Sequence, residues 1–391
     1  MKWQNKGHEY DEMYTNIEKK KVFYLFGAGD RGKQFVESFK NELCIAGYID
    51  NSQSKHKRVI NGYECFYLDE INLNENTGVI ITMDQFSLSG AVKQLENNGF
   101  IKRKDFFLLD EFISVYFVYK YNKVYFSTIS FLPSTVCNLN CRHCLNFNPF
   151  AKKFYFRSLD DLINDVDLFF SIVDYIMVFH LSGGEPFLYK QTPDIVEYIS
   201  SRYSDKIGTF RMVTNGTIVP SDEVLERIAR CKIEIKIDDY RDQVPRFNDK
   251  FELLNKKLSQ FGIKHYAFKV DEWIDLAPEK TDYSSYTEDE LIFHRDSCNQ
   301  SWEELRGGRL YSCNYAAYAM VAGIAGEQDL EETFDLKQVN ETNKKELVEF
   351  RLGFTQKGYT EFCKKCRGFT PDNSETVPAA VQNEKKSSEI K

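Results

Sequence analysis

The sequence predicts an α/β protein with two successive parallel-sheet units and a cysteine-rich region after them. Three observations carry this prediction. Short apolar runs alternate with amphipathic stretches through residue 295, and such alternation is typical of parallel strands joined by crossover helices. A glycine-rich turn directly follows the first apolar run. Four cysteines lie beyond residue 296, where the alternation fades.

The chain has 391 residues, of which 42% are hydrophobic and 28% are charged. At about 150 residues per domain this length predicts two or three domains, and the apolar content excludes a wholly disordered chain. No apolar run reaches the ~18 residues of a membrane helix, and the first residues lack a secretory signal. We therefore expect a cytoplasmic protein with no membrane partner. The net charge of −8 argues against general nucleic-acid binding.

The N-terminal unit begins with a strand at 22–26 and a glycine-rich turn. GAGDRG matches the G-x-G-x-x-G pattern that joins a strand to a helix in dinucleotide-binding folds. Asp50 follows Gly29 by 50 − 29 = 21 residues, at the end of the next predicted strand, where a ribose-binding acid belongs. We predict a Rossmann-like domain over 15–125 that binds a nucleotide or nucleotide-sugar through Gly27, Gly29, Gly32 and Asp50. The alternative is a turn with a purely structural role.

A second series of strand–helix units is predicted over 126–295. Consecutive units of this kind favour a partial (β/α)6 TIM barrel, in which the chemistry lies at the carboxyl ends of the strands. Helix caps are predicted at Ser158, Thr192 and Ser221. The strands of the two units are predicted at 45–49, 78–83, 105–109, 124–136, 176–182, 210–216, 232–240 and 264–270.

A cluster of cysteines follows the first barrel strand. CNLNCRHC places Cys137, Cys141 and Cys144 as C-x3-C-x2-C. In a reduced compartment, grouped cysteines indicate a metal site or catalysis. Three thiolates leave one iron of a [4Fe–4S] cluster open to a small molecule. The alternatives at this point are a structural zinc site, or a cluster completed by a distant cysteine.

A second motif follows the second barrel strand. Gly183, Gly184, Glu185 and Pro186 stand directly at the end of that strand. Paired glycines expose backbone polar groups to a ligand, and the adjacent carboxylate can accept a hydrogen bond from an ammonium group. A simple turn explains a glycine pair alone, but it explains poorly both motifs in this order.

These motifs resemble those of the radical S-adenosylmethionine (radical SAM) superfamily. CNLNCRHC looks like its cluster loop, and GGEP like its methionine-binding motif. The resemblance implies that the three cysteines bind three irons of a [4Fe–4S] cluster and that the fourth iron binds SAM. It also implies that reduction of the cluster cleaves SAM into methionine and a 5′-deoxyadenosyl radical. The SAM-binding residues implied in this way are His143, Gly183, Gly184, Glu185, Pro186, Asn215 and Lys236.

Two of these residues follow the family pattern less closely. His143 fills a position that is usually aromatic and near the adenine. Lys236 stands where the family often has a serine ahead of Asp238, so it is either a partner of the SAM carboxylate or a solvated outward residue.

Four further cysteines form two spaced pairs, Cys298 with Cys313 and Cys363 with Cys366. Four thiolates are enough for a closed cluster or a zinc site. After a radical SAM core, the pattern resembles the twitch extension, the shorter form of the SPASM extension, which holds one auxiliary [4Fe–4S] cluster. We expect two clusters in all, a twitch domain over 296–370 and a disordered tail over 371–391 that lacks large apolar residues.

Substrate contacts are expected from strand-end side chains. His180 and Ser182 share one face of the second barrel strand, and Asp238 lies at the end of the fourth. His180 and Asp238 are the candidate catalytic residues. The alternative for His180 is a satisfied core histidine, and Trp273 is a core residue by default.

The predicted function is that of a radical SAM oxidoreductase acting on a polar small molecule, such as a sugar, cyclitol or nucleotide-linked sugar. The scattered cysteines Cys44, Cys65 and Cys231 are not placed to return hydrogen at the carboxyl end of the barrel. This favours oxidation of a carbinol over epimerisation. The alternatives are an epimerase of the same substrate class and a peptide or protein maturase. A flavodoxin- or ferredoxin-type protein is the expected electron donor.

Overall fold

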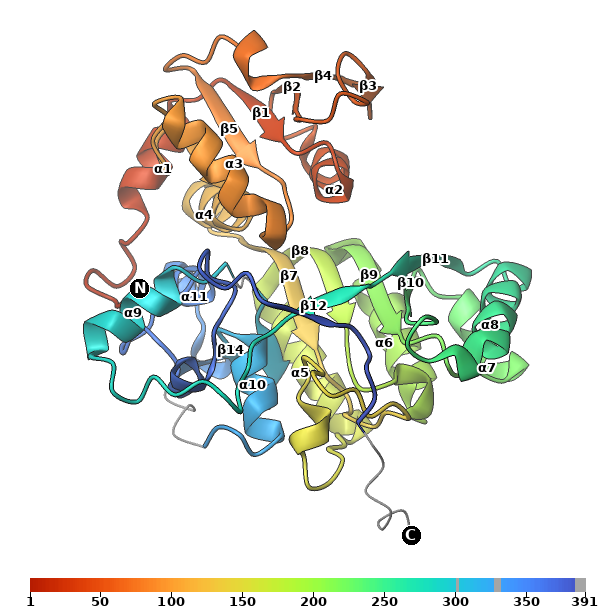
Figure 1. The fold of residues 1–391 in the computed structure, drawn as a ribbon. Helices are drawn as coiled ribbons and strands as arrows, with labels where there is room; N and C mark the ends of the chain where they lie inside the picture. Colours follow the sequence, from red (N-terminus) through yellow and green to blue (C-terminus); the bar gives the residue numbers. More distant parts are fainter. Residues whose placement is uncertain (300–301, 327–331, 384–391) are drawn as a thin grey trace.

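Two sheets built mainly of parallel strands organise the chain, and they are stacked end to end in Figure 1. The computed structural model describes residues 1–299, 302–326 and 332–383. The N-terminal sheet, red to orange in Figure 1, lies at the end of the second sheet from which the strands of that sheet start. We call the second sheet, mostly yellow to green, the barrel sheet.

The N-terminal sheet has six strands in the order β3-β4-β2-β1-β5-β6, and all neighbours are parallel except β3 and β4. Taken along the chain, its parallel strands follow the order 3-2-1-4-5, which is that of doubly wound nucleotide-binding sheets. The elements are α1 Asp11–Glu18, β1 Val22–Phe26, α2 Asp30–Phe39, β2 Ile45–Ile49, β3 Val59–Ile60, β4 Tyr63–Phe66, β5 Thr77–Ile81, α3 Gln85–Asn97, β6 Phe106–Leu108 and α4 Leu109–Tyr121.

The glycine-rich turn joins β1 to α2, and two of its glycines are required by the fold. Gly27 has a φ of +121°, which glycine adopts without steric cost. A Cβ on Gly32 would lie 2.2 Å from the carbonyl oxygen of Gly27, so α2 can start this close to the turn only with glycine there. Nothing lies within 4 Å of a Cβ built on Gly29. Packing within the chain therefore does not require Gly29.

These two glycines give a matched pair of variants. Gly32→Ala is expected to lower the free energy of unfolding by about 1–3 kcal/mol, because the added methyl group has to push the turn away from the helix. Gly29→Ala meets open space at a φ of −90° and is expected to change stability by less than about 0.5 kcal/mol. Urea unfolding followed by circular dichroism measures both. Equal stability of the two variants would contradict the close packing at Gly32.

The barrel sheet has eight strands in the order β11-β10-β9-β8-β7-β13-β14-β15. The first five of these run parallel and are consecutive in the chain, whereas β13 joins β7 from the other side, through the pair Glu304 and Ser130. The strand order is open, with β11 at one edge and β15 at the other. The elements are β7 Val124–Phe131, α5 Leu159–Ile172, β8 Val173–Leu181, α6 Thr192–Tyr203, β9 Ile207–Thr214, α7 Asp222–Ala229, β10 Glu234–Asp239, α8 Asn248–Gln260, β11 Lys264–Lys269, β13 Glu304–Arg306, β14 Arg309–Tyr311 and β15 Thr333–Asp335.

The two faces of the barrel strands differ in polarity. On β7, Ile129 and Phe131 point into the core against the helices, while Thr128 and Ser130 line an internal cavity. This alternation follows from the period of two along a strand. Apolar residues thus bind the strands to α5–α8 and leave a polar interior.

Helix caps explain how two of the barrel helices start. Ser158 accepts a hydrogen bond from the N–H of Asp161 at the start of α5, and Ser221 accepts one from Val224 at the start of α7, as the sequence predicts. Thr192 is the first residue of α6 rather than its cap, a position taken by Gln191. None of the described helices is both long enough and apolar enough to cross a membrane.

The cysteine-rich region packs against both sheets rather than forming a separate body. Its strand β13 extends the barrel sheet, and the start of the chain lies against it, because Lys2 bridges Thr355 and the indole N–H of Trp3 donates to Glu349 at 2.9 Å. The remaining elements are β12 Glu272–Ile274, α9 Glu288–Asp296, α10 Asn314–Val321, α11 Lys344–Arg351 and β16 Thr376–Pro378.

The expectation of disorder from residue 371 onward is wrong for residues 371–383. Strand β16 pairs antiparallel with β12, and Ala379 and Ala380 are fully buried. Backbone pairing and small buried side chains order this segment, and neither requires the large apolar residues whose absence suggested disorder. Residues 384–391 of the predicted tail lie outside the described residues.

Candidate active site

A cavity of about 520 Å³ occupies the interior of the barrel sheet. Its wall at the carboxyl ends of the strands carries Cys137, Cys141 and Cys144, on the loop that leaves β7, together with Gly183 and Gly184. Side chains from β7 to β10 line its middle. This volume lies within the range of about 300–1,000 Å³ that is typical of small-molecule sites.

The three thiols of the loop after β7 lie in largely water-shielded surroundings. Burial raises the pKa of the Cys141 thiol to about 12, and it raises those of Cys137 and Cys144 as well. Such thiols stay protonated near neutral pH unless a metal takes the place of the proton. The side-chain amide of Asn215 approaches the sulfur of Cys137 at 3.6 Å. The predicted SAM-binding residue Asn215 thus lies beside the cysteine loop.

The glycine pair after β8 packs directly on the cysteine loop. The N–H of Gly184 donates to the carbonyl oxygen of Ser134 at 3.0 Å, and the N–H of Glu185 donates to that of Val136 at 2.6 Å. A Cβ on Gly184 would lie 2.2 Å from the Val136 oxygen. Gly184 is therefore glycine because its backbone touches the loop that carries Cys137.

The carboxylate of Glu185 is bound inside the chain rather than facing the cavity. It accepts hydrogen bonds from the hydroxyl of Thr214 and the N–H of Asn215, both at 2.8 Å, and from the N–H of Phe187 at 3.1 Å. Burial raises its pKa to about 7, although these donors act in the opposite direction. We expected this carboxylate to lie along a bound ammonium group. Its oxygens instead accept hydrogen bonds from residues at the end of β9. The adjacent Pro186 is also buried.

His180 on β8 faces the middle of the cavity. Both of its ring nitrogens are shielded from solvent and have no hydrogen-bond partner, so it is not a satisfied core histidine. Burial, and then the positive charges of Arg211 and Lys236, lower its pKa to about 3. A neutral imidazole with so low a pKa is a weak proton acceptor, and it suits hydrogen bonding to a ligand.

Two predicted residues on β10 also line the cavity. The ammonium of Lys236 lies 2.7 Å from Asp238 and 4.8 Å from the ring centre of Phe268. The hydroxyl of Tyr240 donates to Asp238 at 3.1 Å. Lys236 is therefore a cavity residue and not a solvated outward one.

His143 lies away from this cavity. Its side chain faces a separate small depression beside Asp275, with Nδ1 3.9 Å from that carboxylate. Among the described residues, those that line the main cavity do not include His143. The two hollows share Cys144 and Leu145 in their linings, and the contact of His143 with the adenine of SAM stays a prediction.

In the N-terminal domain, the carboxylate of Asp50, the predicted ribose-binding residue, accepts hydrogen bonds from its own chain. Asp50 accepts hydrogen bonds from the N–H of Ala28 at 3.0 Å, from Lys55 at 2.8 Å and from the N–H of Ser52 at 2.9 Å. Burial acts to raise its pKa, but these contacts hold that pKa below its usual value. Asp50 therefore ties the glycine-rich turn to the loop after β2.

Comparison with known proteins identifies the middle of the chain. Residues 131–258 match the model of the Radical SAM superfamily. This part of the chain is similar to the radical SAM domain. The family implies a [4Fe–4S] cluster and SAM, and the site fits both, because three shielded thiols and a glycine pair share one wall of a cavity of sufficient size.

Curated relatives match only part of the chain. The GTP 3′,8-cyclase of Syntrophomonas wolfei subsp. wolfei is 25% identical over 162 residues, which is 40% of this chain and 46% of the relative. GTP 3′,8-cyclase 3 of Mycobacterium tuberculosis is 27% identical over 133 residues, which is 32% of this chain and 33% of the relative. The chain thus spans less than half the length of these relatives.

Two solved structures of SAM-bound proteins were also found. Native anSMEcpe with bound AdoMet is 13% identical, with a TM-score of 0.39 over 63% of this chain and 91% of that one. BtrN in complex with AdoMet and 2-DOIA is 13% identical, with a TM-score of 0.35 over 64% of this chain and 98% of that one.

Beyond the radical SAM domain, the fold brings the two downstream cysteine pairs together. Cys298, Cys313 and Cys366 share one apolar cluster. The pKa of Cys366 is raised well above its usual value by burial and then by the charges of Cys298, Cys313 and Cys363. Backbone N–H groups of Gly368 and Phe369 donate to the sulfurs of Cys366 and Cys298, each at 3.3 Å. No three His, Cys, Asp or Glu side chains of the described residues converge as ligands of a single metal ion, whereas a cubane cluster spreads its thiolates over different irons.

The C-terminal segment 376–383 crosses the cysteine loop of the radical SAM domain. Val381 accepts from the N–H of Arg142 at 2.7 Å, so that Cys141 and Gln382 form a β-bridge. The side chain of Gln382 accepts from the N–H of Asn140 at 2.9 Å and approaches the sulfur of Cys141 with its amide nitrogen at 3.3 Å. This segment therefore covers Cys141.

Arg211, Tyr318 and Gln382 are among the site residues that the sequence analysis missed. Arg211 lies two residues before Val213 on the cavity face of β9, and the period of two counted back from that strand end is the signal that would have found it. Tyr318, whose hydroxyl lies 3.0 Å from that of Ser182, and Gln382 come from distant segments. No local pattern marks either of them.

Removing the C-terminal segment is expected to expose Cys141. In the metal-free protein, truncation before Thr376 should speed iodoacetamide labelling of Cys141 by roughly tenfold or more, because hydration lowers the pKa of a buried thiol. Anaerobic labelling read by mass spectrometry measures this rate. Cys65, fully buried in the N-terminal domain, is the internal control and should keep its rate. Equal protection of Cys141 in both proteins would contradict the covering role.

Proposed function

We propose that this chain is a radical SAM enzyme that reductively cleaves SAM and abstracts hydrogen from a polar small molecule. One observation carries the proposal. The thiols of Cys137, Cys141 and Cys144, the glycine pair after β8 and a set of polar inward side chains all line one cavity within a radical SAM domain.

In this proposal the three thiolates hold three irons, while Gly183, Gly184, Asn215 and Lys236 line the adjoining wall and contact SAM. When bound, the reduced cluster and SAM supply a 5′-deoxyadenosyl radical at this end of the cavity. Glu185 and Pro186 are positioning residues, since Glu185 joins the cysteine loop to the end of β9 through its own hydrogen bonds.

The substrate in this proposal is polar and anionic, such as a nucleotide-linked sugar. Arg211 and Lys236 place two cations in the cavity lining, paired with Glu234 and Asp238, and His180 contributes two unpaired ring nitrogens. The relatives named GTP 3′,8-cyclase support a nucleotide-bearing substrate. The Rossmann-like N-terminal domain and its strand order support the same class.

The favoured reaction is oxidation of a carbinol to a carbonyl. Bound SAM and its reduced cluster would supply the radical that takes a hydrogen atom from the carbinol carbon, a base of the chain would take the hydroxyl proton, and a second cluster would take the remaining electron. Asp238 is the proposed base, because its carboxylate lies in the cavity beside Lys236 and Tyr240. Cys298, Cys313, Cys363 and Cys366 would hold this electron acceptor as a twitch-type [4Fe–4S] site, and a flavodoxin- or ferredoxin-type protein would reduce the first cluster.

The cluster content tests this proposal. Anaerobic reconstitution is expected to give about eight irons per chain. Replacing Cys137, Cys141 and Cys144 together by Ala should remove about half of this iron and abolish SAM cleavage under dithionite. Cys231→Ala is the matched control and should keep both the iron content and the SAM cleavage of the wild type. If the wild-type chain saturates at four irons and also binds zinc, the assignment of an auxiliary cluster to the downstream cysteines is wrong. If the triple variant still cleaves SAM, the assignment of the first cluster to Cys137, Cys141 and Cys144 is wrong.

The mass of the product distinguishes oxidation from epimerisation. Epimerisation needs a hydrogen donor near the pocket, and the cavity-lining cysteines of the described residues are only those of the first cluster. We therefore expect the product made in deuterated water to be two mass units lighter than the substrate. Incorporation of one deuterium at a stereocentre would instead establish an epimerase.

A further inference from the structure

The cavity continues beyond the barrel sheet to the N-terminal domain. Midway along the barrel strands, Ser127, Thr128 and Val178 line it. Past them, the lining consists of Arg31 and Gln34 on α2 and of Asp84 after β5. We call the part of the cavity lined by these six residues the inner chamber. The site therefore has two ends, with the cysteine loop at one and the N-terminal domain at the other.

The inner chamber meets the N-terminal sheet at its ligand-binding edge. Arg31 follows β1, Asp84 follows β5 and Leu109 follows β6, and these three strands are neighbours in the sheet. In doubly wound sheets, ligands bind in the crevice at the carboxyl ends of the strands. That edge faces the inner chamber, and its residue Asp84 is also exposed to solvent.

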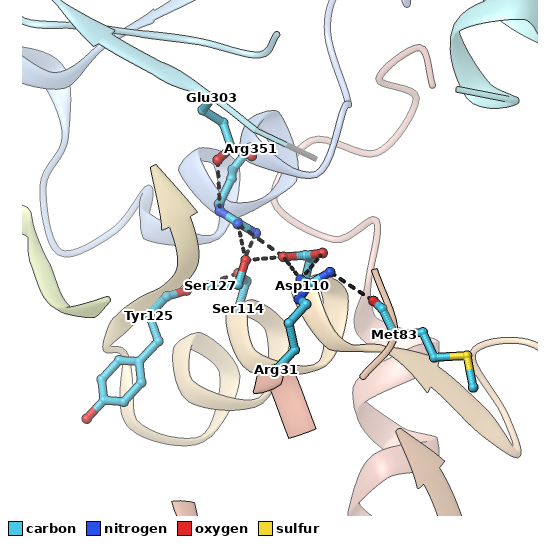
Figure 2. A network of polar contacts seen from close by, with 8 residues as sticks. All are labelled: Arg31, Met83, Asp110, Ser114, Tyr125, Ser127, Glu303 and Arg351. Atoms are coloured by element: carbon cyan, nitrogen blue, oxygen red, sulfur yellow. Dashed lines mark hydrogen bonds and ion pairs between the residues drawn. The ribbon is translucent and has the colours of Figure 1, made fainter. Parts of the chain in front are cut away.

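A polar network holds this junction in place (Figure 2). Arg31 donates to the carbonyl oxygen of Met83 at 3.0 Å and to Asp110 at 3.2 Å. Asp110 also accepts from Ser127, and the guanidinium of Arg351 donates to Ser127 at 2.7 Å. These contacts fix the head group of Arg31 while its side chain stays 29% exposed. The N-terminal domain is thus positioned to take part in binding.

Two side chains of the chamber wall have unused hydrogen-bonding groups. Thr128 is 6% exposed, and its hydroxyl has no partner. His180, one layer nearer the cysteine loop, has two unpaired ring nitrogens. Buried polar atoms of this kind cost about 1–3 kcal/mol each when they stay unpaired. A ligand with polar oxygens at this depth would satisfy them.

Charge and length narrow the class of ligand. Arg31, Arg211 and Lys236 place three cations in the lining, and each is paired with a carboxylate of the chain, Asp110, Glu234 and Asp238 respectively. Asp84 also lines the cavity and accepts from the N–H of Ser87. From Val178, which pairs with Thr128, the chain takes five residues to reach Gly183, or roughly 16 Å at the rise of a strand. SAM would fill the end beside Gly183, and a sugar joined through a diphosphate to a nucleoside is long enough to reach from there into the inner chamber.

We propose that the inner chamber binds the diphosphate of a nucleotide-linked substrate, with Arg31 and Thr128 as its contacts, while the sugar points to the cysteine loop. This inference rests on the proposed function and deepens it. The N-terminal domain then acts as the inner wall of the active site and not as a separate nucleotide store. Asp50, which is engaged within the chain, takes no part.

Calorimetry on the reconstituted holoprotein with UDP-glucose as the probe tests this inference. Thr128→Val keeps the shape of the side chain and removes the hydroxyl, so it should weaken UDP-glucose binding by about tenfold, as expected for a hydrogen bond to a charged group. Ile129→Val, on the opposite face of the same strand, is the matched control and should bind as the wild type does. Inorganic pyrophosphate should compete with UDP-glucose.

Each other outcome of this experiment overturns the inference. These outcomes are no binding of UDP-glucose, equal binding by Thr128→Val, or binding with which pyrophosphate does not compete. Urea unfolding of the two variants separates a folding defect from a binding defect. Cleavage of SAM by the wild type without substrate is measured in parallel. Its loss would overturn the proposed function, whereas failed diphosphate binding beside intact cleavage would overturn only the inner chamber.

Discussion

The buried carboxyl group of Glu185 joins the ends of three neighbouring strands, and the rest of the site depends on this junction. The backbone N–H of Glu185 donates to the carbonyl oxygen of Val136 on the loop after β7. The carboxylate oxygens of Glu185 accept from Thr214 and Asn215 at the end of β9. Loss of the carboxylate would leave three donors without their acceptor, those of Thr214, Asn215 and Phe187, and a buried unpaired donor costs roughly 1–3 kcal/mol. One residue of β8 therefore sets the distance between the cysteine loop, the glycine pair and Asn215.

The other end of the site depends on a second buried network. Arg351 comes from the cysteine-rich region, Asp110 from the N-terminal domain and Ser127 from the barrel sheet. Arg351 also lies 3.6 Å from Glu303, whose pKa burial raises to about 8 against the charge of Arg351. The three regions of the chain therefore meet at this network, beside the inner chamber.

Local patterns were enough to predict the alternation of strands and helices and the cysteine loop, because period, caps and spacing act over a few residues. The β3–β4 hairpin was missed, although its Asn61-Gly62 turn, with φ of 47° and 85°, is a strong signal for one. Non-local features could not be predicted in this way. The pairing of β13 with β7, the segment over Cys141 and the direction of the Glu185 carboxylate depend on contacts between residues far apart in the chain.

For single site residues too, predictions from strand period agreed with the structure better than predictions from motif position. Lys236 and His180 face the cavity because strand period decides their side. The roles of His143 and Asp50 were predicted from their motif positions alone. In the structure the side chain of His143 lies near Asp275, and that of Asp50 pairs with Lys55. A motif thus fixes the backbone more firmly than it fixes the direction of a long side chain.

Electron–nuclear double resonance tests most directly whether the cysteine loop and the glycine pair form one site. The measurement uses the reduced holoprotein with SAM that carries ¹⁵N in its methionine amino group. A cluster held by Cys137, Cys141 and Cys144, with one iron open beside Gly183 and Gly184, predicts a hyperfine coupling of this nitrogen to the cluster. Bound SAM without any such coupling would contradict a shared site.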